Sequence, residues 1–218
     1  MDRVVLSPFN GSQRGVVNGH YRAYGTTSAI APNANAVLAA VRWVAAAATN
    51  APEYPNQAPL VMVPLRISVQ TTVVTAVTAQ RNDAIAAFVQ RSYTVSETTN
   101  VSAFTLSGNN AKMATGFGTS QFNTAGQMAV TSNAAGCTGG TKTGDTQPFG
   151  VAGFPAALGA IGTGTGTLDL YRADIIHGMH PLTLATNEGF TVQWGATALA
   201  SGTVTVTVGV EWMEVVVY

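Results

Sequence analysis

One short stretch of this chain carries residue types that could bind a metal ion. Asp174, His177 and His180 follow one another at intervals of three residues. Two imidazoles and a carboxylate hold a metal only when they converge on it, and on a helix this spacing would spread them across the face. Gly178 and Pro181 also disfavour such a helix. We therefore interpret these histidines as loop residues beside the start of a strand, and we predict no metal site.

Two glycine-rich stretches resemble phosphate-binding loops only in composition. Residues 162–167 alternate glycine with threonine, but a strand pattern follows at 168–171 where a dinucleotide site needs the start of a helix. Residues 139–143 lack the spacing of a P-loop. The sequence therefore predicts no cofactor.

The chain offers no recognisable catalytic constellation either. Cys137 is the only cysteine, it lies in a loop of small residues without a neighbouring histidine, and we interpret it as a structural thiol. A single cysteine excludes an intrachain disulfide and fits a reducing compartment. Glu188, Glu211 and Glu214 are interpreted as turn and edge charges, and the change of parity around Trp212 predicts a β-bulge in the last strand. We predict that the protein is not an enzyme.

Composition narrows the class of protein further. Only 9% of the 218 residues are charged, against about 25% in an average soluble domain. Ten basic residues balance ten acidic ones and form no run, which argues against a nucleic-acid partner. No segment reaches the ~20 apolar residues that span a bilayer, and the start lacks the apolar core of an export signal. We expect a soluble protein without a membrane partner.

Alternating apolar and polar residues predict an all-β fold. The alternation is clearest over 202–218, and over 60–78, where apolar side chains share one face. Residues 35–49 fit either an alanine-rich helix or a strand ending near Ala46, and we favour the strand. The segments at 60–78 and 88–95 predict an antiparallel pair joined at 80–83. Further strands are expected at 102–106, 127–131, 149–152, 168–171, 182–184 and 190–194. Strands and turns at short intervals indicate one antiparallel β-sandwich, of jelly-roll type.

The first 35 residues differ from the rest. They combine weak periodicity with many glycines and scattered aromatic residues. We predict an extended N-terminal arm over residues 1–35, followed by a single β-sandwich domain over 36–218. Aromatic side chains are costly to leave in water, so the arm should lie either on its own domain or on a neighbour.

Several segments together resemble a family of virion structural proteins from tailed bacteriophages. The resemblance covers most of residues 36–218 and consists of strand ends and turns. It is carried by Val41-Arg42-Trp43, the 60–78 strand, Phe88-Val89-Gln90-Arg91, residues 108–113, Thr146-Gln147-Pro148-Phe149-Gly150, residues 180–190 and residues 208–215.

By analogy with phage cement and decoration proteins that use jelly rolls, the resemblance implies a capsid-surface protein. It would be made in the host cytoplasm, form a homotrimer, and bind the major capsid protein and copies of itself. We predict that partner-binding residues lie in the arm: Arg3, Val4, Leu6, Phe9, Arg14, Tyr21, Arg22 and Tyr24. The alternative is a head-fibre or tail-associated module that binds host glycans, for which Tyr54, Tyr171 and Trp194 are candidates only if they point outward.

Overall fold

The structure, a computed structural model, describes residues 15–45, 60–78, 83–107, 111–123, 126–154, 160–174 and 180–217. Within these ranges the chain forms strands and one short 3₁₀ helix, η1, but no α-helix. The elements are β1 (Gly15–Thr26), β2 (Val37–Trp43), β3 (Leu60–Thr75), β4 (Asp83–Val95), β5 (Val101–Ala103), η1 (Gln121–Asn123), β6 (Gln127–Thr131), β7 (Thr141–Gly144), β8 (Gly150–Phe154), β9 (Leu168–Arg172), β10 (Glu188–Trp194) and β11 (Thr203–Val217).

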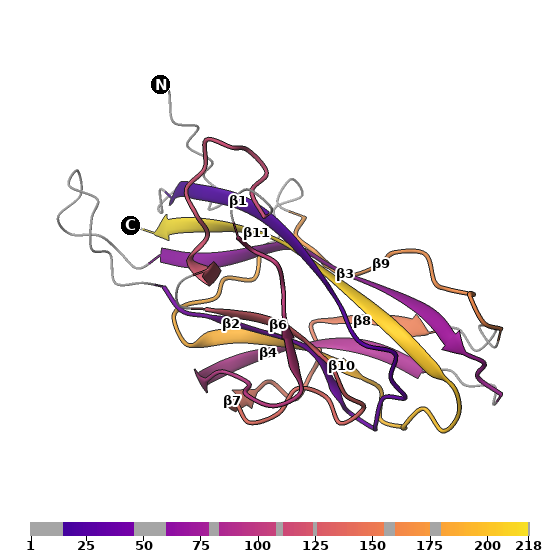
Figure 1. The fold of residues 1–218 in the computed structure, drawn as a ribbon. Coiled ribbons are helices and arrows are strands. Elements are labelled where there is room, and N and C mark those ends of the chain that lie inside the picture. The colour runs from indigo at the N-terminus through magenta and orange to yellow at the C-terminus, as the bar shows by residue number, and fades with distance from the viewer. Residues whose placement is uncertain are drawn as a thin grey trace.

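The strands form two antiparallel sheets packed face to face, as Figure 1 shows. The smaller sheet has the order β1-β11-β3-β9. The larger sheet has the order β5-β6-β2-β10-β4-β7, and β8 also pairs with β4. This architecture confirms the predicted antiparallel all-β sandwich.

The core lies between the two sheets and follows directly from the alternation in the sequence. On β11, Val204, Val206, Val208, Val210 and Trp212 are buried in one cluster with residues of the opposite sheet, including Trp43 and Trp194. Burying each valine or larger apolar side chain contributes roughly 1.5–3 kcal/mol. The threonines between these valines consequently face outward, and this fixes which side chains the smaller sheet presents on its outer face.

The second half of the segment predicted as an arm is a strand of the sandwich. β1 forms the edge of the smaller sheet and pairs with β11 from Gly15–Val217 to Thr26–Thr207. Its glycines hid the strand periodicity, and two of them make room for rings. A Cβ at Gly19 would lie 2.0 Å from the Tyr21 hydroxyl oxygen, and one at Gly25 would lie 2.4 Å from Cε1 of Phe104. Residues 1–14 lie outside the described residues.

Two predictions about the strands are wrong, one about a pairing and one about the extent of a strand. β3 and β4 do not pair with each other, because they lie in opposite sheets, where β3 pairs with β11 and β9 while β4 pairs with β10, β7 and β8. Their connection therefore crosses from one sheet to the other. The strand expected at 182–184 is reduced to an isolated bridge between Met62 and Leu184.

The irregularity predicted near Trp212 exists, but the extra residues lie on the neighbouring strands. Leu65 of β3 is skipped between the pairs Glu211–Arg66 and Trp212–Pro64. β11 itself keeps its alternation from Val204 to Val215. Trp212 faces the core, whereas Met213 faces outward and packs in a small second cluster with Val61, Val63 and Val215. The change of parity in the sequence therefore reflects burial on both faces of β11.

Candidate interaction surface

The structure separates the residues that sequence analysis assigned to partner binding. Tyr21 is fully buried and its ring stacks on Trp212, with centroids 5.5 Å apart. Tyr21 therefore belongs to the core and is not available to a partner, which corrects the prediction. Inward and outward positions alternate on β1, so Arg22 and Tyr24 are exposed on the outer face. Five residues lie outside the described residues: Arg3, Val4, Leu6, Phe9 and Arg14.

The outer face of the smaller sheet carries a row of charged residues that crosses all four strands. Arg22 of β1 pairs in register with Glu211 of β11, Glu211 pairs with Arg66 of β3, and Arg66 pairs with Arg172 of β9. Residues directly opposite each other in an antiparallel sheet project from the same face. We call these four residues the charged row.

The middle of the charged row is already held by contacts within the protein. Nε2 of His20 lies 2.8 Å from Oε1 of Glu211, and Nε of Arg66 donates to Oδ1 of Asp169 at 2.6 Å. The hydrogen bond to Asp169 raises the pKa of Arg66. The ends of the row differ, because Arg22 and Arg172 form no ion pair with any other described residue.

An aromatic residue and several hydroxyl groups flank the charged row. Tyr24 is 59% exposed, and its ring lies against Gly209 of β11. Farther along the sheet, Oγ1 of Thr26 lies 2.8 Å from Oγ1 of Thr207. This face therefore changes from charged to hydroxyl-rich along β11.

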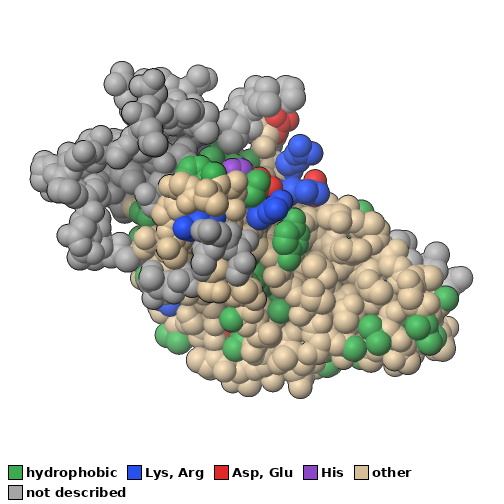
Figure 2. All heavy atoms as spheres, turned by 45° about the horizontal axis from the view of Figure 1, so that its top comes forward, with side chains coloured by type: hydrophobic (Ala, Val, Ile, Leu, Met, Phe, Trp, Pro, Cys, Tyr) green, Lys and Arg blue, Asp and Glu red, His purple; other side chains and the backbone are tan. Residues whose placement is uncertain are grey.

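Most of the charged side chains visible in Figure 2 gather in one region at the top of the view, near an exposed hydrophobic side chain. The described surface around them is mainly uncharged. In this view the charged side chains are therefore clustered and not evenly spread.

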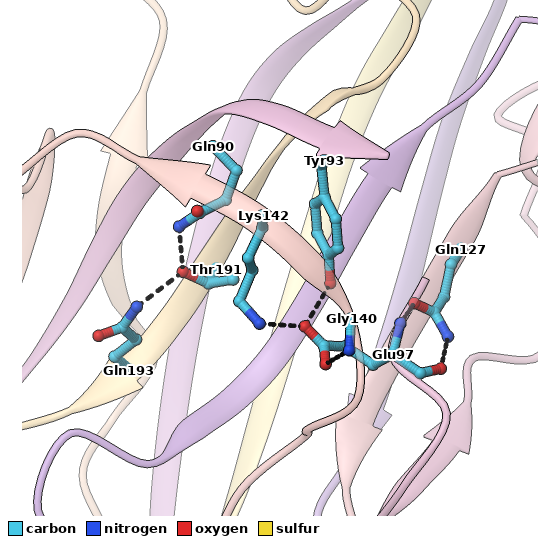
Figure 3. Close-up of polar contacts among 8 residues, drawn as sticks. All are labelled: Gln90, Tyr93, Glu97, Gln127, Gly140, Lys142, Thr191 and Gln193. Carbon is cyan, nitrogen blue, oxygen red and sulfur yellow. Dashed lines mark hydrogen bonds and ion pairs between the residues drawn. The ribbon is translucent and has the colours of Figure 1, made fainter. Parts of the chain in front are cut away.

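A second polar cluster, shown in Figure 3, lies on the outer face of the larger sheet. The Glu97 carboxylate is fully buried and accepts hydrogen bonds from the Tyr93 hydroxyl at 2.8 Å and the Gly140 amide at 2.8 Å. It also pairs with Nζ of Lys142. Burial and the hydrogen bond to Glu97 raise the pKa of Tyr93.

The side chain of Gln127 extends the same cluster to the backbone of Glu97. Its Nε2 donates to the Glu97 carbonyl at 2.7 Å, and its Oε1 accepts from the Glu97 amide at 2.8 Å. Nearby, Nε2 of Gln90 donates to Oγ1 of Thr191 at 2.9 Å. Because each group around the carboxylate is held by a protein partner, the cluster serves to join β4, β7 and the adjoining loops.

A second buried carboxylate lies inside the sandwich. Oε1 of Glu214 accepts hydrogen bonds from the Ser120 hydroxyl at 2.6 Å, the Gln121 amide at 3.1 Å and the Trp212 indole at 3.3 Å. Burial raises the pKa of Glu214, and these donors partly offset the rise. The carboxyl group attaches η1 to β11.

Within the described residues, the structure does not assemble the residues considered for metal or thiol chemistry into a site. His177 lies outside the described residues, and no three histidine, cysteine, aspartate or glutamate side chains within the described ranges could hold a metal ion. Cys137 is buried, which raises the pKa of its thiol to about 12. In the part of the chain that is described, no helix is long and apolar enough to cross a bilayer.

The residues named for glycan binding differ in their exposure where the structure describes them. Trp194 is 1% exposed and its indole donates to the Thr197 carbonyl at 3.1 Å, so it does not point outward and is not a candidate. Tyr171 is half-buried, with its ring 5.4 Å from that of Phe149. Tyr54 lies outside the described residues.

Sequence reasoning identified Arg22 but missed the charged row around it. His20 and Glu211 are 191 residues apart, and Arg66 and Asp169 are 103 apart, so only the strand register brings them together.

Comparison of the chain with protein-family models, curated proteins and solved structures finds no match.

Proposed function

We propose that this protein is a non-enzymatic structural protein of a tailed-bacteriophage virion, a cement or decoration protein on the capsid surface. It is made in the host cytoplasm, assembles as a homotrimer, and binds the major capsid protein. Its role is to stabilise the head through contacts that exist only in the assembled particle.

The strand order is the observation that carries this proposal. The smaller sheet runs β1-β11-β3-β9, and the larger sheet contains the run β2-β10-β4 with β7 and β8 beside β4. If β5 and β6 are additions at one edge, and β7 and β8, which pair with successive parts of β4, count as one strand, eight strands remain in the alternating order of two interlocked Greek keys. We infer a jelly roll from this order, a fold used by viral capsid proteins and lectins.

The outer surface also supports a role in assembly. A low charge density weakens repulsion between copies, which suits close packing on a lattice. The charged row gives one face a directional polar contact, and Tyr24 supplies an exposed ring beside it. Weak contacts of this kind sum on a closed shell, because each bound copy raises the effective concentration at the next contact.

We further propose that residues 1–14, which precede β1 in the sequence, act as an anchor that binds the capsid. This segment contains Val4, Leu6 and Phe9 as apolar groups, with Arg3 and Arg14 as polar ones. β1 pairs along β11, so Tyr21 serves the fold and the anchor is shorter than the predicted arm.

Co-sedimentation with particles of the major capsid protein tests the proposal. The purified chain is mixed with particles at increasing concentrations, and its mass is measured separately by sedimentation equilibrium. We expect saturable binding and the mass of a trimer. A monomer that stays in the supernatant at every particle concentration would contradict the proposal.

The second candidate function is glycan binding on a head fibre or tail. Tyr24 favours it, because an exposed aromatic ring beside hydroxyl and arginine side chains is the type of surface that sugars contact. A glycan array with the wild type and Tyr24→Ala separates the two functions. Glycan binding that requires Tyr24, without particle binding, would favour this candidate.

A further inference from the structure

We propose that the charged row binds an acidic protein segment whose two carboxylates, about 14 Å apart, lie opposite Arg22 and Arg172. This inference rests on the proposed function for the source of the segment, which is the capsid surface. It adds the chemistry of that surface and the direction in which the segment crosses the sheet.

Arg22 and Arg172 are the groups of the row that remain available. Both are exposed, and neither forms an ion pair with another described residue. A guanidinium group binds a carboxylate through two parallel hydrogen bonds, so each end can fix one carboxylate in position. Glu211 and Arg66 between them are held by His20 and Asp169.

The register sets the distance between the two arginines. Arg22 and Arg172 are the first and last members of a row that crosses four neighbouring strands. Three inter-strand spacings of about 4.8 Å give about 14 Å between their backbones. In an extended peptide, residues four positions apart are also about 14 Å apart and project from the same side. An extended segment crossing the strands with acidic residues at positions i and i+4 therefore fits.

The acidic residues in and beside the charged row favour a protein over a nucleic acid. Glu211 and Asp169 lie among the arginines, and each is already paired. A polynucleotide carries a negative charge at every phosphate and would place some of them against these carboxylates. A peptide carries its charges only at selected positions, so it can match the ends of the row and leave the middle uncharged. Tyr24 beside the row offers a ring for an apolar side chain.

Charge reversal in the full chain tests the role of the two arginines. Arg22→Glu and Arg172→Glu should each weaken particle binding roughly fivefold, and the double variant roughly twentyfold or more. The matched control is Arg91→Glu, because Arg91 is also exposed but lies on the larger sheet, paired with Asp145. Its binding should be unchanged. Unaltered binding by the double variant would overturn the inference while leaving the proposed function intact.

Zero-length cross-linking identifies the chemistry of the partner. In Arg22→Lys and Arg172→Lys, a carbodiimide joins the new amine to any carboxylate that contacts it, and peptide mass spectrometry locates the bond. We expect both positions to link to aspartate or glutamate residues of one capsid segment, four positions apart. Two results would overturn the inference: cross-links from the two positions to unrelated capsid segments, or no cross-link although the variant is bound to the particle.

Soluble polymers separate failure of the inference from failure of the proposed function. The wild type should bind immobilised poly-L-glutamate at low salt, and Arg22→Glu/Arg172→Glu should lose this binding while Arg91→Glu keeps it. If the polymers give this pattern but the chain does not bind particles, the proposed function is wrong and the inference about the charged row still stands. Equal binding by wild type and double variant, or tighter binding to a thymidine oligonucleotide than to poly-L-glutamate, would overturn the inference.

Discussion

The ring of Tyr24 lies against Gly209 on the neighbouring strand, where a Cβ at position 209 would be 2.6 Å from Cε1 of the tyrosine. This glycine lets the exposed ring lie close to the sheet beside the charged row. Gly189 differs, because a Cβ there would lie 2.0 Å from the backbone carbonyl oxygen of Val41.

These two glycines should respond differently to alanine. In Gly209→Ala the Tyr24 ring can turn away, and the hydroxyl of the buried Ser68, which would lie 2.7 Å from the new Cβ, can rotate. The lower chain entropy of alanine offsets these lost contacts, so the free energy of unfolding should change by less than about 1 kcal/mol. In Gly189→Ala a backbone atom must move, and we expect a loss of about 3 kcal/mol. Urea unfolding measures both. Equal losses would show that the strand backbone adapts as readily as a surface ring.

The Lys142–Glu97 pair should stabilise the larger sheet measurably. Lys142→Met leaves the fully buried Glu97 carboxylate without a cation, and we expect a loss of about 3 kcal/mol in the free energy of unfolding. Lys112→Met is the matched control, with an expected change below about 0.5 kcal/mol, since no salt bridge to another described residue holds Lys112.

The double variant Glu97→Gln/Lys142→Met should recover much of this loss, because no uncompensated charge is then buried. Chemical denaturation of all four proteins at one pH makes the comparison. A double variant as unstable as Lys142→Met alone would mean that packing of the lysine, and not its charge, stabilises the sheet.

Glu214 should make stability depend on pH. Burial raises its pKa above the ordinary value of 4.5, so the folded chain holds the proton more tightly than the unfolded chain. The resulting stabilisation is complete below pH 4.5 and is lost as the pH rises through the raised pKa. Glu214→Gln removes this titration.

The stability of the wild type relative to Glu214→Gln should therefore fall between pH 4.5 and the raised pKa, and level off above it. Urea titrations at a series of pH values give this difference in unfolding free energy directly. The other titratable groups are the same in both proteins, so their contributions cancel. A constant difference, or one that grows with pH, would contradict the assignment.

Truncation should distinguish the anchor from the edge strand. Deleting residues 2–14 should leave the unfolding midpoint nearly unchanged and reduce co-sedimentation with particles. Deleting residues 2–25 also removes nearly all of β1 with Tyr21, and exposes the paired edge of β11, so the remaining domain should be destabilised or aggregate. Full particle binding by the shorter deletion would refute the anchor.

Alternation in the sequence was enough to predict most strands, because β-branched residues at every second position are typical of a strand with one buried face. It failed at β1, where glycines replaced the outward and inward side chains that mark a strand. It also failed for the pairing of β3 with β4, since periodicity does not say whether a connection turns back or crosses to the other sheet.

The charged row could not be predicted for a related reason. Arg22, Glu211, Arg66 and Arg172 meet only through the register of four strands, and a shift of one residue in any strand would turn its side chain to the other face. Glu97 and Lys142 are likewise 45 residues apart and meet only where β4 pairs with β7.

The proposed role, stabilisation of a capsid by adhesion between subunits, can be measured on the particle itself. The quantity is the temperature at which particles of the major capsid protein disrupt, followed by light scattering with and without saturating amounts of the chain. Because a ligand that binds only the assembled state stabilises that state, we expect disruption to shift to a higher temperature. The same disruption temperature with the chain bound at saturation would contradict the account.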